Sequence, residues 1–398
     1  MRADRLLTRP FVLVSAANLA NGLAFNLFLH LPGYLTDLGA SEVDVGFIVG
    51  VAAIASILIR PAVGKAMDTR GRRSVIIAGN VLSVFAVLLY LTVSTIGPWV
   101  YIVRVIHGLS EAILFSALFT YGADVVPPSR LTEGLAIFGT SGLLPIALGG
   151  LIGDFILGFS DFTTLFWVSF GFAVISLMLS LPLPEPDLDG DGSERQGFVS
   201  AMLQKDLAPL WWLTGIFAFA LTAYFTFLKT FVDETGIGSL GLFFSTYVSM
   251  AIAVRLTLAW LPERVGPKRV LYPSISLLVA GLVVLSVATG SGHVAIAGLM
   301  CGVGHGFGFP ILYGFVIRRA GVRDRGSAVA IFTSLFDVGI LVGGPILGAV
   351  IAISGYTAMF LVAGASLVIG LVVFAIWDHG VMRRGSSMLE RPVPSHHL

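Results

Sequence analysis

The chain has 398 residues, of which 56% are apolar and only 12% are charged, and its mean hydropathy is +0.93. A soluble domain carries roughly 25% charged residues, so this composition excludes a water-soluble globular protein and predicts an integral membrane protein. The net charge of +1 gives no reason to expect a nucleic-acid partner, and a single cysteine, Cys301, excludes an internal disulfide and a cysteine metal cluster.

Apolar segments long enough to cross a bilayer, which takes about 20 residues, follow one another along almost the whole chain. We predict twelve spans, at residues 11–36, 45–66, 74–94, 99–125, 132–159, 162–183, 209–231, 239–261, 270–289, 294–317, 327–353 and 356–377. The first segment is too long for a cleavable signal peptide and is better interpreted as the first span. The predicted fold class is an all-α integral membrane protein with two bundles of six helices.

A polar, acidic and glycine-rich segment interrupts the apolar pattern between spans six and seven. Its alternating aspartates lack the closing glutamate of a calcium-binding loop, so a flexible linker is the better interpretation. We therefore predict an N-terminal bundle at residues 1–183, a cytoplasmic linker at 184–208, a C-terminal bundle at 209–378 and a cytoplasmic tail at 379–398.

Positive charges predict the orientation, because Lys and Arg collect in cytoplasmic loops. If the N-terminus is inside, every Lys and Arg falls in a predicted cytoplasmic segment except Arg60, Arg104, Lys229 and Arg255. Both termini are then cytoplasmic, because the number of spans is even. The preference for arginine over lysine is typical of a GC-rich prokaryote, so we expect a multi-pass protein of the prokaryotic cytoplasmic membrane.

One charged motif occurs twice, 195 residues apart, and each copy ends an apolar segment. The copies read Arg60-x3-Gly64-x3-Asp68-x2-Gly71-x-Arg73 and Arg255-x3-Ala259-x3-Glu263-x2-Gly266-x-Lys268. Gly64 would allow close helix approach and Gly71 a tight turn. The duplication predicts two related halves, and a repeated charged junction between spans is typical of transporters.

Three motifs resemble those of the major facilitator superfamily. Its signature between spans two and three is matched by Gly64-Lys-Ala-Met-Asp68-Thr-Arg-Gly71-Arg72-Arg73, and its span-four motif by Arg104-x3-Gly108. The glycine-proline motif of the drug/proton antiporter branch is similar to span five, with Gly142, Pro145, Gly149 and Gly150, although the proline is displaced. The resemblance implies twelve helices, alternating access and a substrate site near the midplane between the halves.

The resemblance also implies a role for the loop motif. Asp68 would latch the cytoplasmic ends of the halves together with Arg72 and Arg73 while the outside is open. Asp124, at the end of span four, would be the acidic partner of Arg72. The alternative is that these residues only anchor the cytoplasmic side of the membrane.

Two arginines inside spans, Arg60 and Arg255, lie two turns from the loop acids. They either attract an anionic substrate or pair across the turns with Asp68 and Glu263. We favour pairing for at least one of them.

Span four carries three ionisable residues on one arc of roughly 60°, because Arg104, His107 and Glu111 are spaced three and four apart. A carboxylate in a low-dielectric cavity holds a proton more tightly, and a nearby arginine opposes this effect. We therefore predict Glu111 as the principal proton site, with Arg104 tuning it and His107 assisting. The alternative is a static buried ion pair that fixes the helix register.

The second half offers His305 and Asp337 near the midplane, which either form a functional pair or serve helix packing. Span one carries a polar stripe that either forms hydrogen bonds between helices or faces the substrate. The stripe consists of Asn18, Asn21, Asn26 and His30. Aromatic residues in spans four, seven and ten would suit an amphipathic organic substrate if they line the cavity, although such stripes also serve packing. The candidates are Phe115, Tyr224, Phe309 and Tyr313.

These features predict a secondary active transporter that exports a small organic compound, drug-like or a metabolite, in exchange for protons. Two alternatives stay open: proton-linked uptake of a sugar or organic anion, and a non-transporting membrane sensor or assembly protein on a transporter scaffold. We do not expect an enzyme or a metal site, because no nucleophile–base set, metal cluster or nucleotide-binding sequence is apparent. The proton gradient is the expected energy source, without a cofactor, and the monomer is the expected functional unit.

Overall fold

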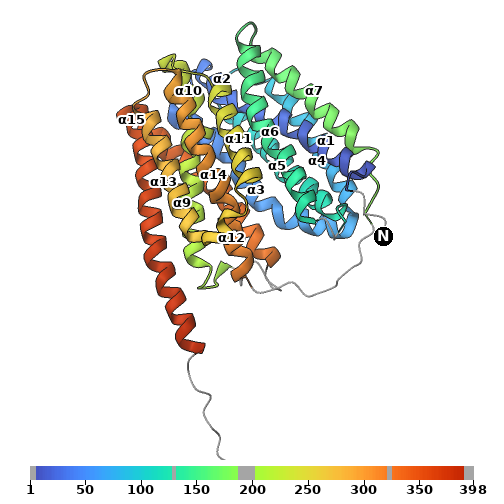
Figure 1. Ribbon diagram of the computed structural model, residues 1–398. Helices are drawn as coiled ribbons and strands as arrows, with labels where there is room; N and C mark the ends of the chain where they lie inside the picture. Colours follow the sequence, from blue (N-terminus) through green and yellow to red (C-terminus); the bar gives the residue numbers. More distant parts are fainter. Residues whose placement is uncertain (1–5, 128–130, 187–201, 321–324, 390–398) are drawn as a thin grey trace, which may run out of the picture.

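The structure is a computed structural model that describes residues 6–127, 131–186, 202–320 and 325–389, and it is helical throughout these ranges (Figure 1). The first half contains α1 (Arg9–Asn26), η1 (Leu27–His30), α2 (Leu31–Asp37), α3 (Glu42–Arg70), α4 (Arg72–Tyr90), α5 (Pro98–Asp124), α6 (Leu131–Leu157) and α7 (Phe162–Ser180). The second half contains α9 (Ala208–Phe225), α10 (Leu228–Thr235), α11 (Leu240–Thr257), α12 (Leu261–Val265), α13 (Pro267–Ser286), α14 (Ser291–Arg319) and α15 (Arg325–Leu389). The predicted all-helical class is confirmed.

Within the described residues, eleven helical segments are long and apolar enough to cross a membrane. The last of them, Ser327–Gly380, has 54 residues, which is more than twice the length that one span needs. Gly355 divides it, because its backbone turns to φ 77° and ψ 178° in the middle of α15. The structure therefore has twelve spans, as the sequence predicts.

Local sequence explains where the helices begin and turn. At the start of α3, Ser41 and Asp44 form a capping box, in which each side chain binds the backbone N–H of the other. Between α3 and α4 the chain reverses over Gly71, whose φ is 88°, and Gly266 has φ 100° at the same place in the second half. A residue with a side chain is strained at such angles, which explains why both copies of the motif keep this glycine.

The repeat extends far beyond the loop motif. Adding 195 to the bounds of α4 gives 267–285, and α13 spans Pro267–Ser286. The same shift takes α5 to 293–319, and α14 spans Ser291–Arg319. It takes α6 to 326–352, where α15 begins at Arg325. One constant offset therefore pairs the residues of the two halves along several spans.

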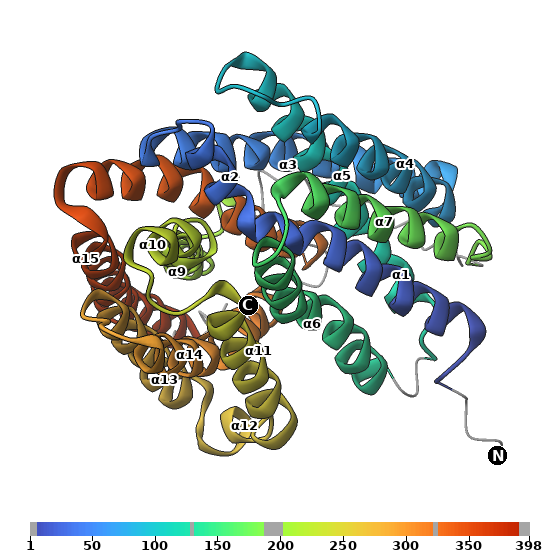
Figure 2. The ribbon, with the colours of Figure 1, turned by 90° about the horizontal axis from the view of Figure 1, so that it is seen from above.

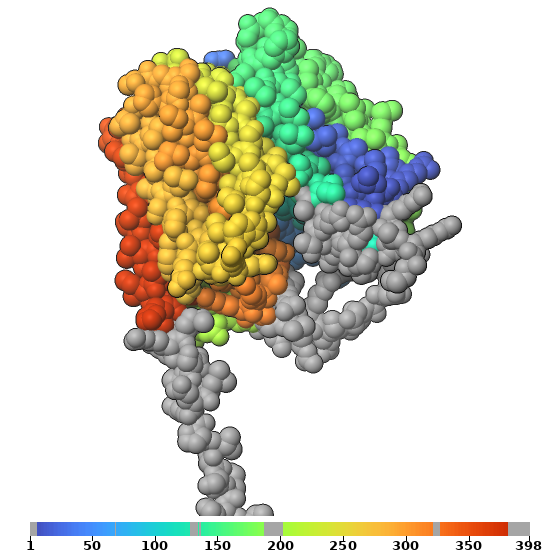
Figure 3. Space-filling model, viewed as in Figure 1, coloured from blue at the N-terminus to red at the C-terminus, as the bar shows by residue number. Residues whose placement is uncertain are grey.

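The halves lie side by side, with α3 against α15 and α6 against α11 (Figure 2). We call the end with loops 38–41, 158–161 and 236–239 the far end, and the end with Gly71 and Gly266 the linker end. In Figure 1 the far end is at the top, beside α2 and α10, and α15 extends below the bundle at the linker end. In Figure 3 the surface of α11 (yellow) meets that of α6 over the upper part of the molecule.

Glycines form both seams between the halves near the far end. A Cβ atom on Gly46 of α3 would lie 2.2 Å from the carbonyl oxygen of Gly344 in α15. On the other seam, a Cβ atom on Gly241 of α11 would lie 2.9 Å from Cα of Leu151 in α6. Small residues let helix backbones approach this closely. Because Gly46 and Gly241 differ by 195, the same position of each half forms the close contact.

Candidate functional site

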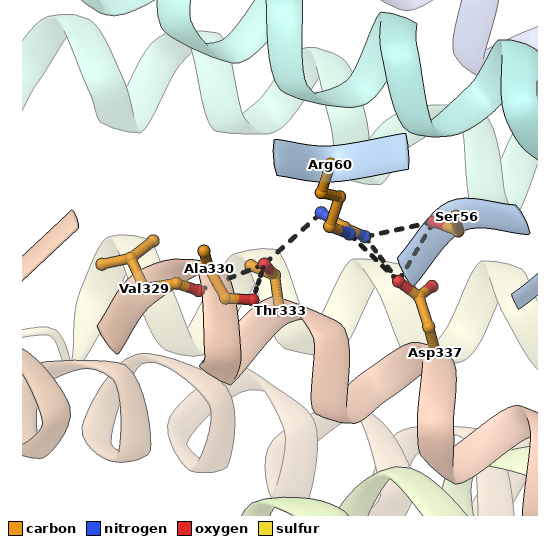
Figure 4. Close-up of polar contacts among 6 residues, drawn as sticks. All are labelled: Ser56, Arg60, Val329, Ala330, Thr333 and Asp337. Carbon is orange, nitrogen blue, oxygen red and sulfur yellow. Dashed lines mark hydrogen bonds and ion pairs between the residues drawn. The ribbon is translucent and has the colours of Figure 1, made fainter. Parts of the chain in front are cut away.

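An ion pair in the membrane-spanning region joins the two halves (Figure 4). Nη2 of Arg60, on α3, lies 2.7 Å from Oδ2 of Asp337, on α15, and Nε lies 3.2 Å from the same oxygen. Ser56 donates to that oxygen at 3.1 Å, and the guanidinium also contacts Thr333 at 3.4 Å. The two charged side chains are only 14% and 18% exposed. Each charge is therefore neutralised across the boundary between the halves.

This pairing corrects one prediction and bears on a second. Asp337 does not bind His305, because His305 hydrogen-bonds the hydroxyl of Tyr247 inside the second half. Arg60 pairs with Asp337 across the halves. The predicted pair of Arg60 with Asp68 involves a side chain that lies outside the described residues. The ion-pair partner of a residue depends on how each helix is rotated about its own axis. The depth of the residue in the membrane does not determine this rotation.

The predicted pair of Arg255 with Glu263 is also wrong. In the second half, α11 ends at Thr257 and a separate short helix, α12, carries Glu263 at the surface. The two residues therefore do not follow one helical register, unlike Arg60 and Asp68 on the continuous α3. Nε of Arg255 instead donates a long hydrogen bond of 3.4 Å to the carbonyl of Gly306.

Glu111 lies near the ion pair but does not take part in it. Its carboxylate accepts one hydrogen bond, at 3.3 Å, from the side-chain amide of Asn21 on α1. One turn further along α5, Phe115 lies with its ring centre 6.0 Å from the guanidinium carbon of Arg60. No Lys, Arg or His of the described ranges forms a salt bridge with Glu111. Its hydrogen-bond partner is thus a neutral amide.

The other members of the predicted span-four constellation point into the first half. His107 is buried, with Nδ1 3.3 Å from the hydroxyl of Tyr90 and its ring centre 4.4 Å from that of Phe28. Arg104 is 8% exposed, and its Nε and Nη1 atoms have no hydrogen-bond partner in the described structure. Sharing an arc of the helix therefore does not bring His107 into contact with Glu111.

Most of the polar stripe of span one serves helix packing. Asn18 donates to the hydroxyl of Ser141 at 2.9 Å, and Asn26 donates to a carbonyl of its own helix at 2.8 Å. His30 is buried with Nε2 3.3 Å from the carbonyl oxygen of Gly150. Among the four stripe residues, Asn21 is the one that contacts the candidate proton site.

Two carboxylates of the first half accept hydrogen bonds from the second half at the far end. Asp154 of α6 accepts from the backbone N–H of Gly241 at 2.6 Å. Glu42 of α3 accepts from the hydroxyl of Tyr356 at 2.5 Å and from that of Thr230 at 3.2 Å. These bonds lie beside the glycine seams and close the far end further.

The loop motif makes its described contacts within the first half. Nε of Arg72 lies 3.2 Å from Oδ2 of Asp124, which confirms the predicted pair. Arg73 donates from its backbone N–H to Glu185 at 3.1 Å and from its guanidinium to the carbonyl of Leu181 at 2.8 Å. Gly64 has no atom within 4 Å of an added Cβ, so the close helix approach predicted there is wrong. These contacts tie α4 to α5 and to the residues after α7.

The second half has a matching ion-pair cluster that sequence reasoning missed. The buried carboxylate of Asp378 lies 2.5 Å from Lys268 and 2.5 Å from Arg319. Under the 195-residue offset Lys268 corresponds to Arg73, and Arg319 corresponds to Asp124. An acid of the first half is therefore replaced by a base, and Asp378 supplies the negative charge. The swap of charge at equivalent positions was the available signal.

The aromatic candidates divide into packed and open positions. Tyr224 is buried, with its ring centre 5.2 Å from that of Phe243, so its predicted place in the cavity is wrong. Phe115 and Tyr313 are exposed in the structure, and the ring of Phe309 lies parallel to that of Tyr313 at 6.4 Å. Two helices, α5 and α14, therefore each expose an aromatic side chain.

The span-five motif packs α6 against its neighbours. A Cβ atom on Gly22 would lie 2.6 Å from Cγ of Pro145, and one on Gly149 would lie 2.7 Å from the carbonyl carbon of Asn26. Gly150 approaches Gly241 across the halves. Gly142 has more room, because the nearest atom to an added Cβ is the amide nitrogen of Asn18 at 3.7 Å.

Comparison with known proteins identifies the family. The family model of the Major Facilitator Superfamily matches residues 11–293 and 235–394. An uncharacterized MFS-type transporter of Salmonella typhimurium is 26% identical over 379 residues, covering 90% of this chain and 94% of its own. The staphylopine export protein of Staphylococcus aureus is 22% identical over 399 residues, covering 96% and 98%.

Solved structures show the same fold. The nucleoside transporter NupG has a TM-score of 0.75 at 14% identity, covering 93% of this chain and 99% of its own. A bacterial homologue of the lysosomal transporter Spinster, in an inward-facing and unoccupied conformation, has a TM-score of 0.72 at 13% identity, covering 99% and 100%. With a family match over nearly its whole length and twelve spans in two related bundles, the chain belongs to the Major Facilitator Superfamily of membrane transporters.

Proposed function

We propose that this transporter exports a small organic compound in exchange for protons, and that Glu111 is its principal proton site. The observation that carries the proposal is the environment of Glu111: a carboxylate in the middle of α5 with a neutral amide as its hydrogen-bond partner. A charge inside the membrane is costly unless it is paired. Asp337 and Asp378 have cationic partners and can stay ionised. Glu111 forms no salt bridge with a described residue and can bind a proton.

Alternating access would let Glu111 exchange its proton with one side at a time. The far end is closed by the glycine seams and by the hydrogen bonds of Asp154 and Glu42. Toward the linker end the packing loosens, since Gly64 has no neighbour within 4 Å of an added Cβ. The described contacts of the loop motif stay within the first half, and the side chain of Asp68 lies outside the described residues. These features support a conformation that is open at the linker end, which the predicted orientation makes cytoplasmic.

Export is supported by similarity to the staphylopine export protein over nearly the whole of both chains, and by the glycine-proline motif of span five. The fold alone does not identify a substrate, because transporters of different kinds share it, including the nucleoside transporter NupG. The bacterial relatives support a place in the cytoplasmic membrane, and the complete two-bundle fold supports a functional monomer.

Proteoliposomes with an imposed pH gradient would test this function. Solute-dependent proton movement is expected with the wild-type protein and is expected to be lost in Glu111→Gln. A matched control is Glu234→Gln, the same chemical change at an exposed position of α10, which should transport like the wild type. Unchanged proton coupling in Glu111→Gln would reject Glu111 as the proton site. Proton flux that ignores every solute in the screen would contradict export.

A further inference from the structure

The two seams between the halves differ at the positions that carry charge. Arg60 and Arg255 correspond under the 195-residue offset, as do the glycines that close the two seams. The acid that neutralises Arg60 has no counterpart: the equivalent of Asp337 is Gly142 on α6. The equivalent of Glu111 is also a glycine, Gly306. The repeat therefore keeps the cation of each seam but supplies an acid at these central positions for only one of them.

The structure shows the consequence at Arg255. Within the described ranges no carboxylate forms an ion pair with it, and its hydrogen bond runs from Nε to the carbonyl of Gly306 at 3.4 Å. The side chain is partly buried in the last turn of α11, near Tyr247 and His305. A guanidinium presents paired N–H groups that match a carboxylate. The hydrogen bond described for Arg255 uses Nε and not the terminal nitrogens. An unneutralised cation within a spanning helix calls for an anionic partner.

The place of the missing acid is open. A Cβ atom on Gly142 would have Asn18 at 3.7 Å and Phe119 at 3.9 Å as its nearest neighbours, which is ordinary contact. On the other seam, the side chain of Asp337 fills the equivalent position and reaches Arg60. A small carboxylate has room at Gly142 without any change in the backbone.

Arg104 offers no equivalent site, because it is almost fully enclosed by the first half. Next to Arg255, in contrast, aromatic rings continue along one face of α14. His305, Phe309 and Tyr313 are spaced four residues apart, with ring centres separated by 5.7 Å and 6.4 Å. These rings suit the apolar body of a ligand whose charged end reaches the arginine.

We propose that Arg255 binds the anionic group of the cargo, and that the cargo is an aromatic or similarly amphipathic organic carboxylate. The carboxylate takes the place that Asp337 occupies on the other seam, and the apolar body lies along the rings of α14. The inference rests on the proposed transport function, because it names the class of substrate that the same cavity accepts.

Binding to the purified protein in lipid nanodiscs tests this assignment without any transport measurement. The probes are phenylacetate, phenylpropionate and indoleacetate, each compared with its neutral amide at equal ionic strength. We expect at least one carboxylate to bind, and its amide to bind about tenfold or more weakly, as the loss of a charged hydrogen bond predicts. Arg255→Gln should lose the preference for the carboxylate, and Arg255→Lys should retain part of it.

A second variant separates the site from general folding effects. Gly142→Asp installs the acid that the repeat lacks, and it should weaken carboxylate binding as much as Arg255→Gln does. Gly142→Asn fills nearly the same volume without the charge, so it should weaken carboxylate binding less than Gly142→Asp does. Amides that bind as well as carboxylates, no binding by any probe, or an unaffected Gly142→Asp would each overturn the proposal. Proton coupling through Glu111 could still be present in that case, so the two proposals fail separately.

Discussion

The ion pair between Arg60 and Asp337 joins the halves in the far-end-closed conformation, and breaking it should favour opening of the far end. Asp337→Asn removes the negative charge and leaves the guanidinium of Arg60 without its counterion. Loss of one partner from a buried pair costs about 3–5 kcal/mol, and an exposed pair contributes about 1 kcal/mol or less. Because the side chains are 14% and 18% exposed, we expect a cost of about 2–3 kcal/mol.

A double-mutant cycle gives this prediction a sharper form. In Arg60→Gln/Asp337→Asn both charges are gone, so no unpaired cation remains in the seam. We expect the free energy of far-end opening in the double variant to lie within about 1 kcal/mol of the wild-type value, although each single change shifts it several-fold more. The coupling energy is the cost of the double variant minus the two single costs, so its magnitude should exceed the cost of Asp337→Asn alone.

Cysteine labelling measures the opening. Cys301 is buried, so Cys301→Ala gives a background in which one new cysteine reports. Ala53 is 5% exposed and lies seven residues before Arg60, on the same face of α3. In an Ala53→Cys reporter, Asp337→Asn should raise labelling by an impermeant maleimide about 30- to 150-fold, and the double variant should restore slow labelling. Equal labelling in all four members of the cycle would refute the reasoning.

Other parts of the structure give three further predictions. Gly46→Ala should slow transport strongly, because the added methyl group would lie 2.2 Å from a backbone oxygen. Gly64→Ala adds its methyl group to free space and should be tolerated. Measurements of solute flux compare the two variants. Asp378→Asn should lower the stability of the protein by about 2–4 kcal/mol, because two cations lose a buried partner. Asp124→Asn should lower it by about 1 kcal/mol or less. Thermal unfolding in detergent compares the two variants. Glu42→Gln should weaken the far-end contact with Tyr356 by about 1–2 kcal/mol and speed labelling of the far end modestly; equal labelling would contradict that contribution.

The spans and the duplication could be predicted because both are one-dimensional properties. A run of about 20 apolar residues indicates a span wherever its neighbours lie. The pair of Arg72 and Asp124 was also accessible, because the loop motif and the end of span four lie at the same membrane depth within one bundle. Asp378 was missed because α15 stays helical beyond the apolar segment, to Leu389, so this aspartate falls just outside the predicted span.

The partners of the central charges could not be predicted, because they lie in different halves. Arg60 and Asp337 are separated by 277 positions, and their contact depends on how α3 and α15 are rotated against each other. The rotation follows from where backbones can approach, and thus from glycines such as Gly46 and Gly344. Glycines carry no charge and little hydropathy signal, so periodicity arguments overlook them.

The position of these glycines suggests why the repeat diverged where it did. At the far end both seams need the same close approach, and Gly46 and Gly241 are accordingly equivalent. Toward the centre, identical ion pairs in both seams would neutralise both Arg60 and Arg255 and leave neither of them for a ligand. Glycines at the positions equivalent to Asp337 and Glu111 leave one seam closed by its own charges and, under our proposal, the other open to an external anion. A duplicated scaffold can thus hold the halves together on one side and bind cargo on the other.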